Sequence, residues 1–374
     1  MQAQSARKIK TFSIGFHESG FDEAGHARGV AGHLGCDHTE LYVGPREALN
    51  VIPALGDMFD EPFADPSQIP THLVSQMART DVTVALSGDG GDEVFAGYNH
   101  YRRGEMLWRW MSRVPYRLRL FGASIGRGML AERYGRLLAA MPRACGPAQI
   151  SDKIAKARQA LSCEQPDDLY RHIASKWRDP STLAIRACEA SRTPCDPGIA
   201  FDIPGFAERM QFYDSVSYLP DDILTTLDRT TMQVGLEARV PLLDHRVVEF
   251  AWRQPLRRKF RDGNGKWLLR QILHRYVPAE LVDRPKSGFN VPIGSWLRGP
   301  LREWAEDLLD PRQIASDGLL RADNITRMWR EHLSGLRDWR YPLWVVLMLQ
   351  QWNRGRCSHT AAPNGVSLIP GTLA

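Results

Sequence analysis

With 374 residues, of which 43% are hydrophobic and 24% charged, and a formal net charge of +5, the chain has the composition of an ordinary soluble globular protein. No stretch approaches the roughly 20 apolar residues that a membrane span needs, the arginines form no massed basic run, and the first residues lack the apolar segment of a signal peptide. These features predict a cytoplasmic protein whose partners include neither nucleic acid nor a membrane.

The first hundred residues alternate between strand and helix signals. Residues 8–16 and 38–43 resemble strands, and residues 21–35 resemble a helix that Gly35 ends. A further helix leads into the apolar run VTVAL at 82–86. Short continuous apolar strands between helices are typical of a parallel sheet that is covered on both faces. We therefore predict an α/β fold with a parallel sheet, in which residues 82–86 form a buried strand.

Beyond residue 100 the chain shows helical signals only. Residues 101–143 are rich in Arg, Leu and Trp without any strand pattern. In the stretch LREWAEDLL, apolar residues recur at helical spacing and predict one buried face: Leu301, Trp304, Leu308 and Leu309. The apolar run at 343–349 predicts a buried helix.

The polar run SGDGGDE at 87–93 follows directly after the apolar run. In an open parallel sheet, ligands bind outside the carboxyl ends of the strands. Glycines let the backbone approach a ligand and direct N–H groups at phosphate oxygens, whereas carboxylates repel phosphate but bind Mg²⁺. Together they favour a nucleotide polyphosphate with Mg²⁺. The alternative is a solvated turn before a helix, because Asp and Glu stabilise a helix N-terminus.

A second glycine-rich stretch, GNGKWLLR, covers residues 263–270. It lacks the GxxxxGK[ST] frame of a P-loop. A lone lysine after such a turn is usually an exposed turn residue, so this stretch by itself predicts no phosphate site.

Four stretches in a fixed order resemble a known family. They are SGDGGDEVFAGY, YLPDDILTTLDRTTMQVGLEARVPLLDHRVVEFA, GNGKWLLR and RPKSGFNVPIGSWLRG. In this order they look like the synthetase domain of glutamine-hydrolysing asparagine synthetases, and the resemblance runs from about residue 8 to residue 310.

The resemblance implies an α/β fold of adenine-nucleotide alpha hydrolase type, with a partial parallel sheet followed by a mostly helical C-terminal region. On this basis the chain divides into an α/β nucleotide-binding part (1–105), a helical insertion (106–218), a helical C-terminal part (219–356) and a disordered tail (357–374). The implied reaction uses ATP and Mg²⁺ to activate aspartate as β-aspartyl-AMP, and ammonia then displaces AMP. Aspartate and ammonia are the implied partners, and a homodimer is a candidate assembly.

The same resemblance implies the residues that contact ATP. Ser87 and Gly88 match the Ser-Gly pair of the family that contacts the nucleotide. Gly90 lies in the same loop and is included in the predicted ATP contact. Ile14, near the end of the first strand, matches an apolar position beside the nucleotide.

The implied metal and catalytic residues are charged. Asp92 matches a magnesium-binding aspartate, and Glu93 beside it is predicted as a second metal ligand. Asp89 is predicted to be catalytic and stands where the family usually has glutamate, so its charge is retracted by one methylene. Lys266 matches a lysine of the family whose cation would stabilise charge that develops on phosphorus or at the acyl centre.

Two features of the family do not occur in this sequence. One is the SGGxDS loop, which cradles pyrophosphate, and the other is the N-terminal glutaminase domain with its cysteine nucleophile. The sequence is therefore expected to be the C-terminal part of a synthetase that lacks one edge of the ATP site. Its ATP-dependent chemistry is expected to be incomplete, and it is expected to hydrolyse no glutamine of its own. Two other functions stay open: an inactive remnant or scaffold, and a ligase of the same fold that acts on another carboxylate.

Other polar residues have both a structural and a functional interpretation. His38 is interpreted as structural, and Asp221 as a helix N-cap. Arg239 either orients Asp244 or the loop, or forms a buried ion pair that positions the helices, and the ion pair is favoured. Lys286 is either a substrate contact or a structural turn, and the sequence favours neither.

Overall fold

The structure is a computed structural model that describes residues 1–18, 20–125, 157–177, 180–187, 203–283 and 291–360. Four strands are described: β1 (Lys10–Phe16), β2 (Asp37–Val43), β3 (Val84–Leu86) and β4 (Glu237–Arg239). The N-terminal half contains α1 (Ala24–Leu34), α2 (Pro45–Met58), α3 (Gln68–Arg79), α4 (Gly91–Val94), α5 (Asn99–Met111), α6 (Tyr116–Ile125) and α9 (Pro166–Ala174). Short 3-10 turns are η1 (Gln2–Gln4), η2 (Pro180–Thr182) and η4 (Pro241–Leu243).

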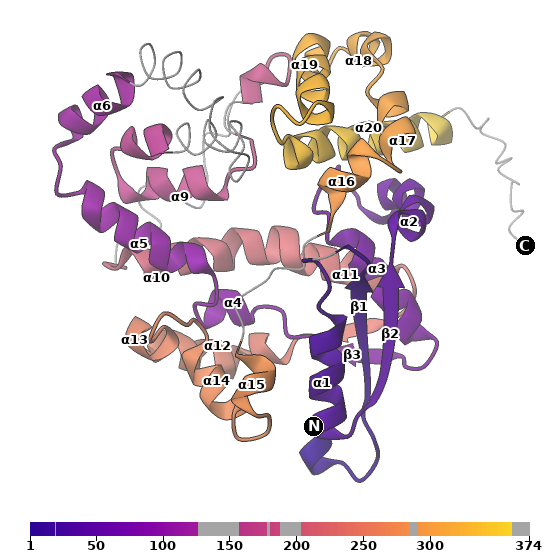
Figure 1. The fold of residues 1–374 in the computed structure, drawn as a ribbon, viewed down its shortest axis with the longest axis vertical. Coiled ribbons are helices and arrows are strands. Elements are labelled where there is room, and N and C mark those ends of the chain that lie inside the picture. Colours follow the sequence, from indigo (N-terminus) through magenta and orange to yellow (C-terminus); the bar gives the residue numbers. More distant parts are fainter. Residues whose placement is uncertain (19, 126–156, 178–179, 188–202, 284–290, 361–374) are drawn as a thin grey trace, which may run out of the picture.

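The described residues of the C-terminal half are mostly helical, as Figure 1 shows, and include the strand β4. Its elements are α10 (Phe206–Tyr213), the π-helical segment η3 (Asp214–Leu224), α11 (Thr225–Met232), α12 (His245–Arg253), α13 (Leu256–Lys259), α14 (Trp267–Leu273), α15 (Ala279–Val282), α16 (Ile293–Arg298), α17 (Arg302–Leu308), α18 (Pro311–Asp317), α19 (Ala322–Leu333) and α20 (Arg340–Thr360). The described part of the chain contains no helix that is long and apolar enough to cross a bilayer.

The β1–α1–β2 unit confirms the α/β prediction. β1 and β2 pair in parallel, with Lys10 opposite Asp37 and Phe16 opposite Val43. The connecting helix α1 ends at Gly35, whose φ of 70° is the left-handed conformation that glycine adopts without a steric penalty. Apolar side chains of both strands pack into the core, as the strand pattern predicts.

The strand predicted within residues 82–86 is present as β3, but the prediction that it is buried is wrong. β3 pairs in parallel with β4 and, in the described part of the chain, with no other strand, so β1–β2 and β3–β4 form two separate sheets. The side chains of Val84 and Leu86 are 40% and 49% exposed. A parallel strand is buried only when strands flank it and helices cover both faces. β4 lies along one edge of β3, and a single flanking strand is not enough.

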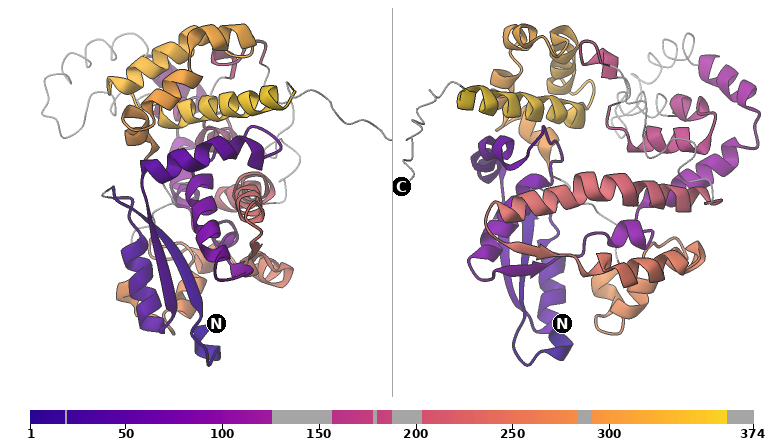
Figure 2. Two further views of the ribbon diagram at one scale, coloured as in Figure 1. Left: turned by 90° about the vertical axis from the view of Figure 1, so that its right-hand side faces the viewer. Right: turned by 180° about the vertical axis from the view of Figure 1, so that it is seen from behind.

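The largest core lies where the β1–β2 sheet meets the C-terminal helices. α2 and α3 pack between β1 and the helices α16, α17, α19 and α20 (Figures 1 and 2). The predicted apolar face of α17 is confirmed, since Leu301, Leu308 and Leu309 are buried and Trp304 packs against them. The apolar run at 343–349 forms the buried part of α20.

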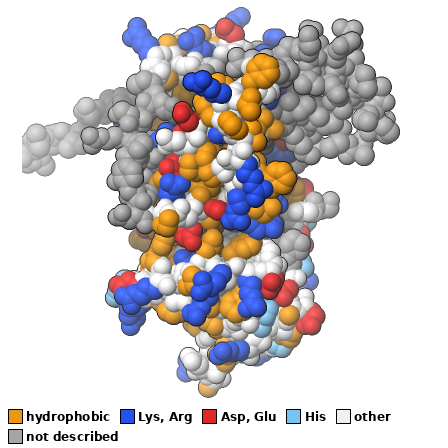
Figure 3. Space-filling view, turned by 90° about the vertical axis from the view of Figure 1, so that its left-hand side faces the viewer, with side chains coloured by type: hydrophobic (Ala, Val, Ile, Leu, Met, Phe, Trp, Pro, Cys, Tyr) orange, Lys and Arg blue, Asp and Glu red, His pale blue; other side chains and the backbone are white. Residues whose placement is uncertain are grey.

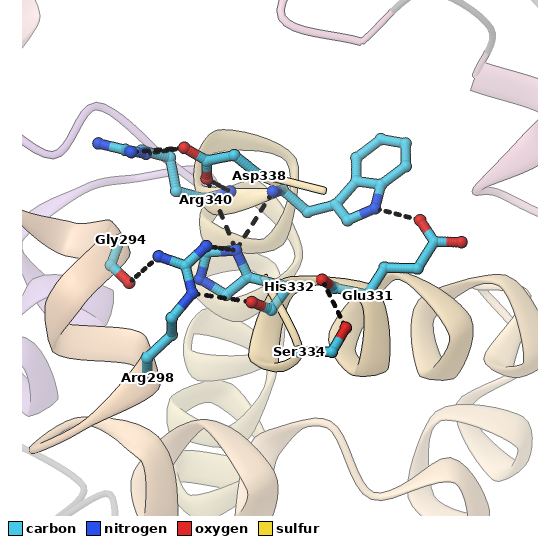
Figure 4. Close-up of polar contacts among 8 residues, drawn as sticks. Gly294, Arg298, Glu331, His332, Ser334, Asp338 and Arg340 are labelled. Atoms are coloured by element: carbon cyan, nitrogen blue, oxygen red, sulfur yellow. Dashed lines mark hydrogen bonds and ion pairs between the residues drawn. The ribbon is translucent and has the colours of Figure 1, made fainter. Parts of the chain in front are cut away.

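A buried histidine joins the C-terminal helices (Figure 4). His332 is fully buried at the end of α19, and Arg298 of α16 donates to its carbonyl oxygen at 2.8 Å and to Gly294 O at 3.2 Å. The imidazole Nδ1 accepts from the backbone N–H of Trp339 at 3.2 Å. Burial, and then the guanidinium of Arg298, lower the pKa of His332 to about 4. The neutral ring therefore serves as a structural link between α16, α19 and the start of α20.

The predicted N-cap at Asp221 is wrong, because α10, η3 and α11 form one continuous helical rod (Figure 2). Pro220 lies inside this rod and has no N–H to donate. The π-helical pattern of η3 accommodates it, and Thr225 Oγ1 donates to the Pro220 carbonyl oxygen at 2.9 Å. The expected domain boundary at 218/219 falls inside this rod, and the boundary at 105/106 falls inside α5.

Candidate active site

The loop 87–93 leaves β3 at its carboxyl end, as predicted. The backbone N–H of Ser87 donates to Arg239 O at 2.9 Å, which extends the β3–β4 pairing by one residue. Ser87 Oγ donates to a carboxylate oxygen of Asp89 and fixes that side chain within the loop. Gly88 is exposed, and a Cβ atom built on it would meet no heavy atom within 4 Å. This side of the loop is therefore open to a ligand.

The second half of the loop packs on the segment that follows β4. Gly90 has φ +78°, and a Cβ atom there would lie 2.2 Å from Leu243 Cδ2. A Cβ atom on Gly91 would lie 2.8 Å from Leu242 Cδ1. Glycine suits Gly90 for its backbone conformation, and a side chain at either position would have to displace a leucine side chain. The motifs SGDGGDE and GLEARVPLLD are packed together in this way, although about 150 residues separate them in the sequence.

Lys266 and Asp92 form the contact that brings the third motif to the loop. Lys266 Nζ lies 2.9 Å from Asp92 Oδ2, and the two side chains are 33% and 23% exposed. The backbone N–H of Lys266 also donates to Phe95 O at 3.1 Å. The lysine is therefore fixed to the acidic loop through both its backbone and its ammonium group, and it keeps access to solvent.

Close backbone packing makes this contact possible. A Cβ atom on Gly265 would lie 2.3 Å from Ala96 O, and one on Gly97 would lie 1.9 Å from Asp92 Oδ1. Two non-glycine residues beside these glycines, Ala96 and Lys266, both have φ +55°. Such conformations cost about 1–3 kcal/mol each and often occur at functional sites. The segments 95–97 and 264–266 are therefore strained and closely packed around the Lys266–Asp92 pair.

Glu93, the second predicted metal ligand, has a different environment from Asp92, and its role toward a metal stays a prediction. Its side chain is 1% exposed, and Glu93 Oε1 accepts a hydrogen bond from Tyr98 Oη at 2.5 Å. Burial is the main cause of a raised pKa for this carboxyl group. Gln211 of α10 donates to the Glu93 carbonyl oxygen at 2.7 Å. Glu93 thus points into the helical interior, and the adjacent acids have different environments.

A buried polar cluster beneath the loop was not predicted from the sequence. Asp214, 3% exposed, accepts from Tyr101 Oη at 2.6 Å and from Tyr170 Oη at 2.5 Å, and His100 Nε2 lies 3.0 Å from it. These side chains come from α5, α9 and η3. Each looks like an ordinary helical residue in the sequence, and only the tertiary packing brings them together.

The predictions for Ile14 and His38 have different outcomes. Ile14 is 6% exposed and packs in the core of the β1–β2 sheet, and its predicted place beside a nucleotide stays a prediction. His38 is structural, as favoured, because its ring nitrogens lie 2.8 Å from Thr11 Oγ1 and 3.1 Å from Ser13 Oγ.

The favoured prediction that Arg239 forms a buried ion pair is wrong, and its side chain does not orient Asp244. Arg239 is exposed and pairs with its strand neighbour Glu237 at 2.8 Å. Asp244 instead caps α12 and accepts from the backbone N–H of Arg246 at 3.0 Å. Lys286 lies outside the described residues.

A second acidic group lies on the rod. Asp222 of η3 and Asp65 share Lys176, whose Nζ lies 3.7 Å and 3.5 Å from their carboxylates. Burial first, and the neighbouring Asp65 second, raise the pKa of Asp222 to about 7. The three residues are distant in sequence, so no local pattern could have indicated the group.

Asp222→Asn is expected to change how stability depends on pH. The folded-state pKa of about 7 lies above the ordinary value of 3.8, so the folded protein binds more protons than the unfolded chain between these values. The contribution of Asp222 to the free energy of unfolding is therefore fully present below about pH 4 and is lost as the pH rises through 7. Urea unfolding at pH 5 and pH 8 should show that the variant gains stability relative to the parent at the higher pH. If the difference in free energy of unfolding between variant and parent were the same at pH 5 and pH 8, the raised pKa of Asp222 would be contradicted.

The fold and the site together define the class of protein: an α/β protein in which an acidic, glycine-rich loop after a parallel strand meets a lysine from a distant segment. The chain belongs to the asparagine synthase family, whose sequence model it matches over residues 1–354.

Relatives of known name agree with this family. The chain is 31% identical over 370 residues to "Asparagine synthetase [glutamine-hydrolyzing] 1" of Bacillus subtilis (strain 168), which covers 97% of this chain and 54% of that protein. It is 32% identical over 357 residues to "Putative asparagine synthetase [glutamine-hydrolyzing]" of Mycobacterium bovis. This match covers 95% of this chain and 52% of that protein. A shorter match, 30% over 134 residues, joins it to the human asparagine synthetase and covers 32% of this chain. The chain spans about half the length of the first two relatives.

Proposed function

We propose that this chain is the synthetase part of an ATP-dependent carbon–nitrogen ligase, which activates the side-chain carboxylate of aspartate and transfers it to ammonia. The Lys266–Asp92 contact carries the proposal, since it joins a cation and a carboxylate at the open end of a parallel strand. Membership in the asparagine synthase family and the names of the relatives support the substrates. We further propose an adenine-nucleotide alpha hydrolase fold and a cytoplasmic location.

The residues of the loop would bind the nucleotide, and Lys266 would stabilise the charge that develops in the reaction. Gly88 and Gly90 would bring backbone N–H groups to the ATP phosphates on the open side of the loop. Ser87, whose own N–H is bonded to Arg239 O, would contact the nucleotide through its side chain. The ammonium group of Lys266 would stabilise negative charge as the aspartate carboxylate attacks the α-phosphorus and pyrophosphate leaves. Asp89, whose carboxylate is oriented by Ser87, would be the catalytic carboxylate at the same edge of the loop.

The donor set can hold Mg²⁺ when ATP is bound. No three candidate ligands come together among the described residues, but Mg²⁺ commonly binds one or two protein carboxylates, with water and substrate phosphates completing its shell. Asp92, partly exposed at the loop, would be the protein ligand, and the ion would neutralise phosphate charge. Because Glu93 is buried against Tyr98, Asp89 is the other carboxylate available in the loop.

Asp92→Asn tests this proposal directly. In the parent protein, ATP is expected to bind at least about tenfold more tightly with Mg²⁺ than with a chelator. A neutral amide is a much poorer ligand for a hard dication, so the variant should bind ATP with nearly the same affinity in both conditions. Isothermal titration calorimetry with ATP, in the presence of magnesium chloride or EDTA, measures the ratio.

Asp307→Asn provides a matched control, because Asp307 also pairs with a cation, Arg354, but lies in α17. This variant should keep the magnesium dependence of the parent. Equal ATP affinity with and without magnesium in the parent protein would contradict the metal assignment, and no ATP binding in either condition would contradict the proposed function.

A further inference from the structure

The helices α5 and α6 expose an unusual amount of apolar surface. Seven large apolar side chains between residues 106 and 121 are more than 40% exposed: Met106, Leu107, Trp110, Val114, Leu118, Leu120 and Phe121. Trp110 is 70% exposed and Phe121 64%. Single exposed apolar residues are normal on a protein surface, whereas a concentration of them marks an interaction site.

The opposite faces of the two helices are packed, so the exposed faces are not products of loose folding. Tyr101, Gly104 and Met111 of α5 are buried, and Met210 of α10 packs on Gly104. Arg119 of α6 is 6% exposed and donates to Cys163 O at 2.8 Å. Each helix therefore has one face fixed to the protein and one apolar face that points outward.

Arginines surround the apolar side chains. Five are exposed between residues 102 and 117: Arg102, Arg103, Arg109, Arg113 and Arg117. Residues 99–125 contain one acidic residue, Glu105, which pairs with Arg109 at 3.3 Å. Within the part of the chain that the structure describes, the other four arginines form no ion pair with a carboxylate. The surface therefore has a strong local excess of positive charge.

The position of these helices makes the surface accessible. α5 and α6 lie along one outer edge of the molecule (Figure 1), and Figure 3, viewed toward that edge, shows apolar side chains beside clusters of Lys and Arg. The candidate active site lies elsewhere, around α4 and α14. We call the exposed side chains of residues 102–121 the α5–α6 surface.

We propose that the α5–α6 surface binds peripherally to membranes that contain anionic phospholipids. Tryptophan, phenylalanine and leucine on one face, flanked by arginine, are the side chains with which interfacial helices insert at the boundary between headgroups and acyl chains. The arginines would contact the phosphates and anionic headgroups, and each such cation strengthens the attraction. The surface lies on a folded domain and crosses no bilayer, so the lack of a spanning helix is compatible with it.

Charge favours this ligand over a second copy of the chain. A twofold contact would bring two copies of the same arginine-rich surface together, with one glutamate on each side to offset the charge. Nucleic acid would suit the arginines, but aliphatic side chains such as Met106, Leu118 and Leu120 offer bases no stacking surface. An anionic lipid surface offers negative headgroups to the arginines and an apolar acyl region to the exposed apolar side chains.

Vesicle co-sedimentation of the whole chain tests the proposal. One set of vesicles contains phosphatidylcholine alone, and the other also contains phosphatidylserine. We expect binding to the anionic vesicles that weakens as salt is added. Trp110→Ser with Phe121→Ser should weaken it at least about tenfold through lost apolar burial. Arg103→Gln with Arg113→Gln should weaken it about 30-fold, from roughly one basic contact each.

Two matched double variants serve as controls, because they change exposed residues of the same kinds elsewhere: Leu319→Ser with Leu336→Ser, and Arg253→Gln with Arg330→Gln. Both should bind like the parent, and circular dichroism checks that all variants are folded. The proposal is overturned if the folded parent ignores anionic vesicles, or if the α5–α6 variants bind as well as the controls. It is also overturned if the parent forms a dimer without lipid that the α5–α6 variants abolish, since the surface would then be a protein interface.

Discussion

Replacing Lys266 by alanine is expected to lower the rate of ammonia-dependent amide formation by about 10²–10³-fold, the usual effect of removing one preorganised electrostatic stabiliser. The ammonium group lies at the open end of the loop, fixed by its backbone and by Asp92. Its charge matters most where negative charge develops in the transition state. The loss should therefore appear in kcat more than in KM. Formation of asparagine and release of pyrophosphate, with ATP, magnesium, aspartate and an ammonium salt supplied, measure the rate without any need for glutamine hydrolysis.

Lys266→Arg should restore little of the activity. A planar guanidinium cannot replace a compact ammonium group at one oxygen, and the closely packed segments 95–97 and 264–266 leave little room for a larger head group. Normal turnover in the alanine variant would show that Lys266 is a turn residue without a catalytic role.

Gly265→Ala is expected to destabilise the folded protein by about 1–3 kcal/mol, the usual cost of overpacking a tightly packed position. The new methyl group would lie 2.3 Å from Ala96 O, which is a backbone atom and cannot rotate away. The segment carrying Lys266 would have to move, so activity should fall together with stability. Denaturant unfolding gives the first effect, and the pyrophosphate assay gives the second.

Gly25→Ala is the matched control. Gly25 lies in α1, and a Cβ atom built on it meets no heavy atom within 4 Å. Alanine there should be neutral or stabilise the helix by up to about 1 kcal/mol. A Gly265→Ala protein as stable as the control would mean that the close approach of the two backbone segments is unnecessary for the fold.

Local patterns were sufficient for the elements whose environment depends on neighbours in sequence. The β1–α1–β2 unit, the apolar face of α17 and the buried run of α20 each follow from residue spacing and a glycine stop signal. The loop at 87–93 was placed correctly at the end of a strand for the same reason. That Lys266 meets Asp92 could not be read from either motif alone, and the family resemblance was needed to connect the two segments.

Tertiary packing decided the features that the sequence did not reveal. Val84 and Leu86 are apolar and resemble core residues, but their exposure depends on which strands flank β3. Glu93 and Asp92 are adjacent acids, yet one is buried against Tyr98 and the other faces Lys266. Pro220 indicates a helix start in most sequences, and here a π-helical segment carries the rod through it.

The α5–α6 surface illustrates the same limit. In the sequence, residues 101–143 are simply rich in Arg, Leu and Trp, and the search for a membrane span considers only continuous apolar length. Whether Trp110 and Phe121 are core or surface residues depends on which face of each helix packs on α9 and α10. The expectation that no membrane is involved therefore rested on a test that detects spanning helices and not interfacial ones.

Hydrogen exchange with mass spectrometry, with and without ATP and Mg²⁺, tests most directly whether the loop and Lys266 form the nucleotide site. Slower exchange on addition of nucleotide is predicted in peptides that cover residues 87–95 and 264–270, with α19 unchanged. Slower exchange confined to other segments, or no change at saturating nucleotide, would contradict the assignment of this site.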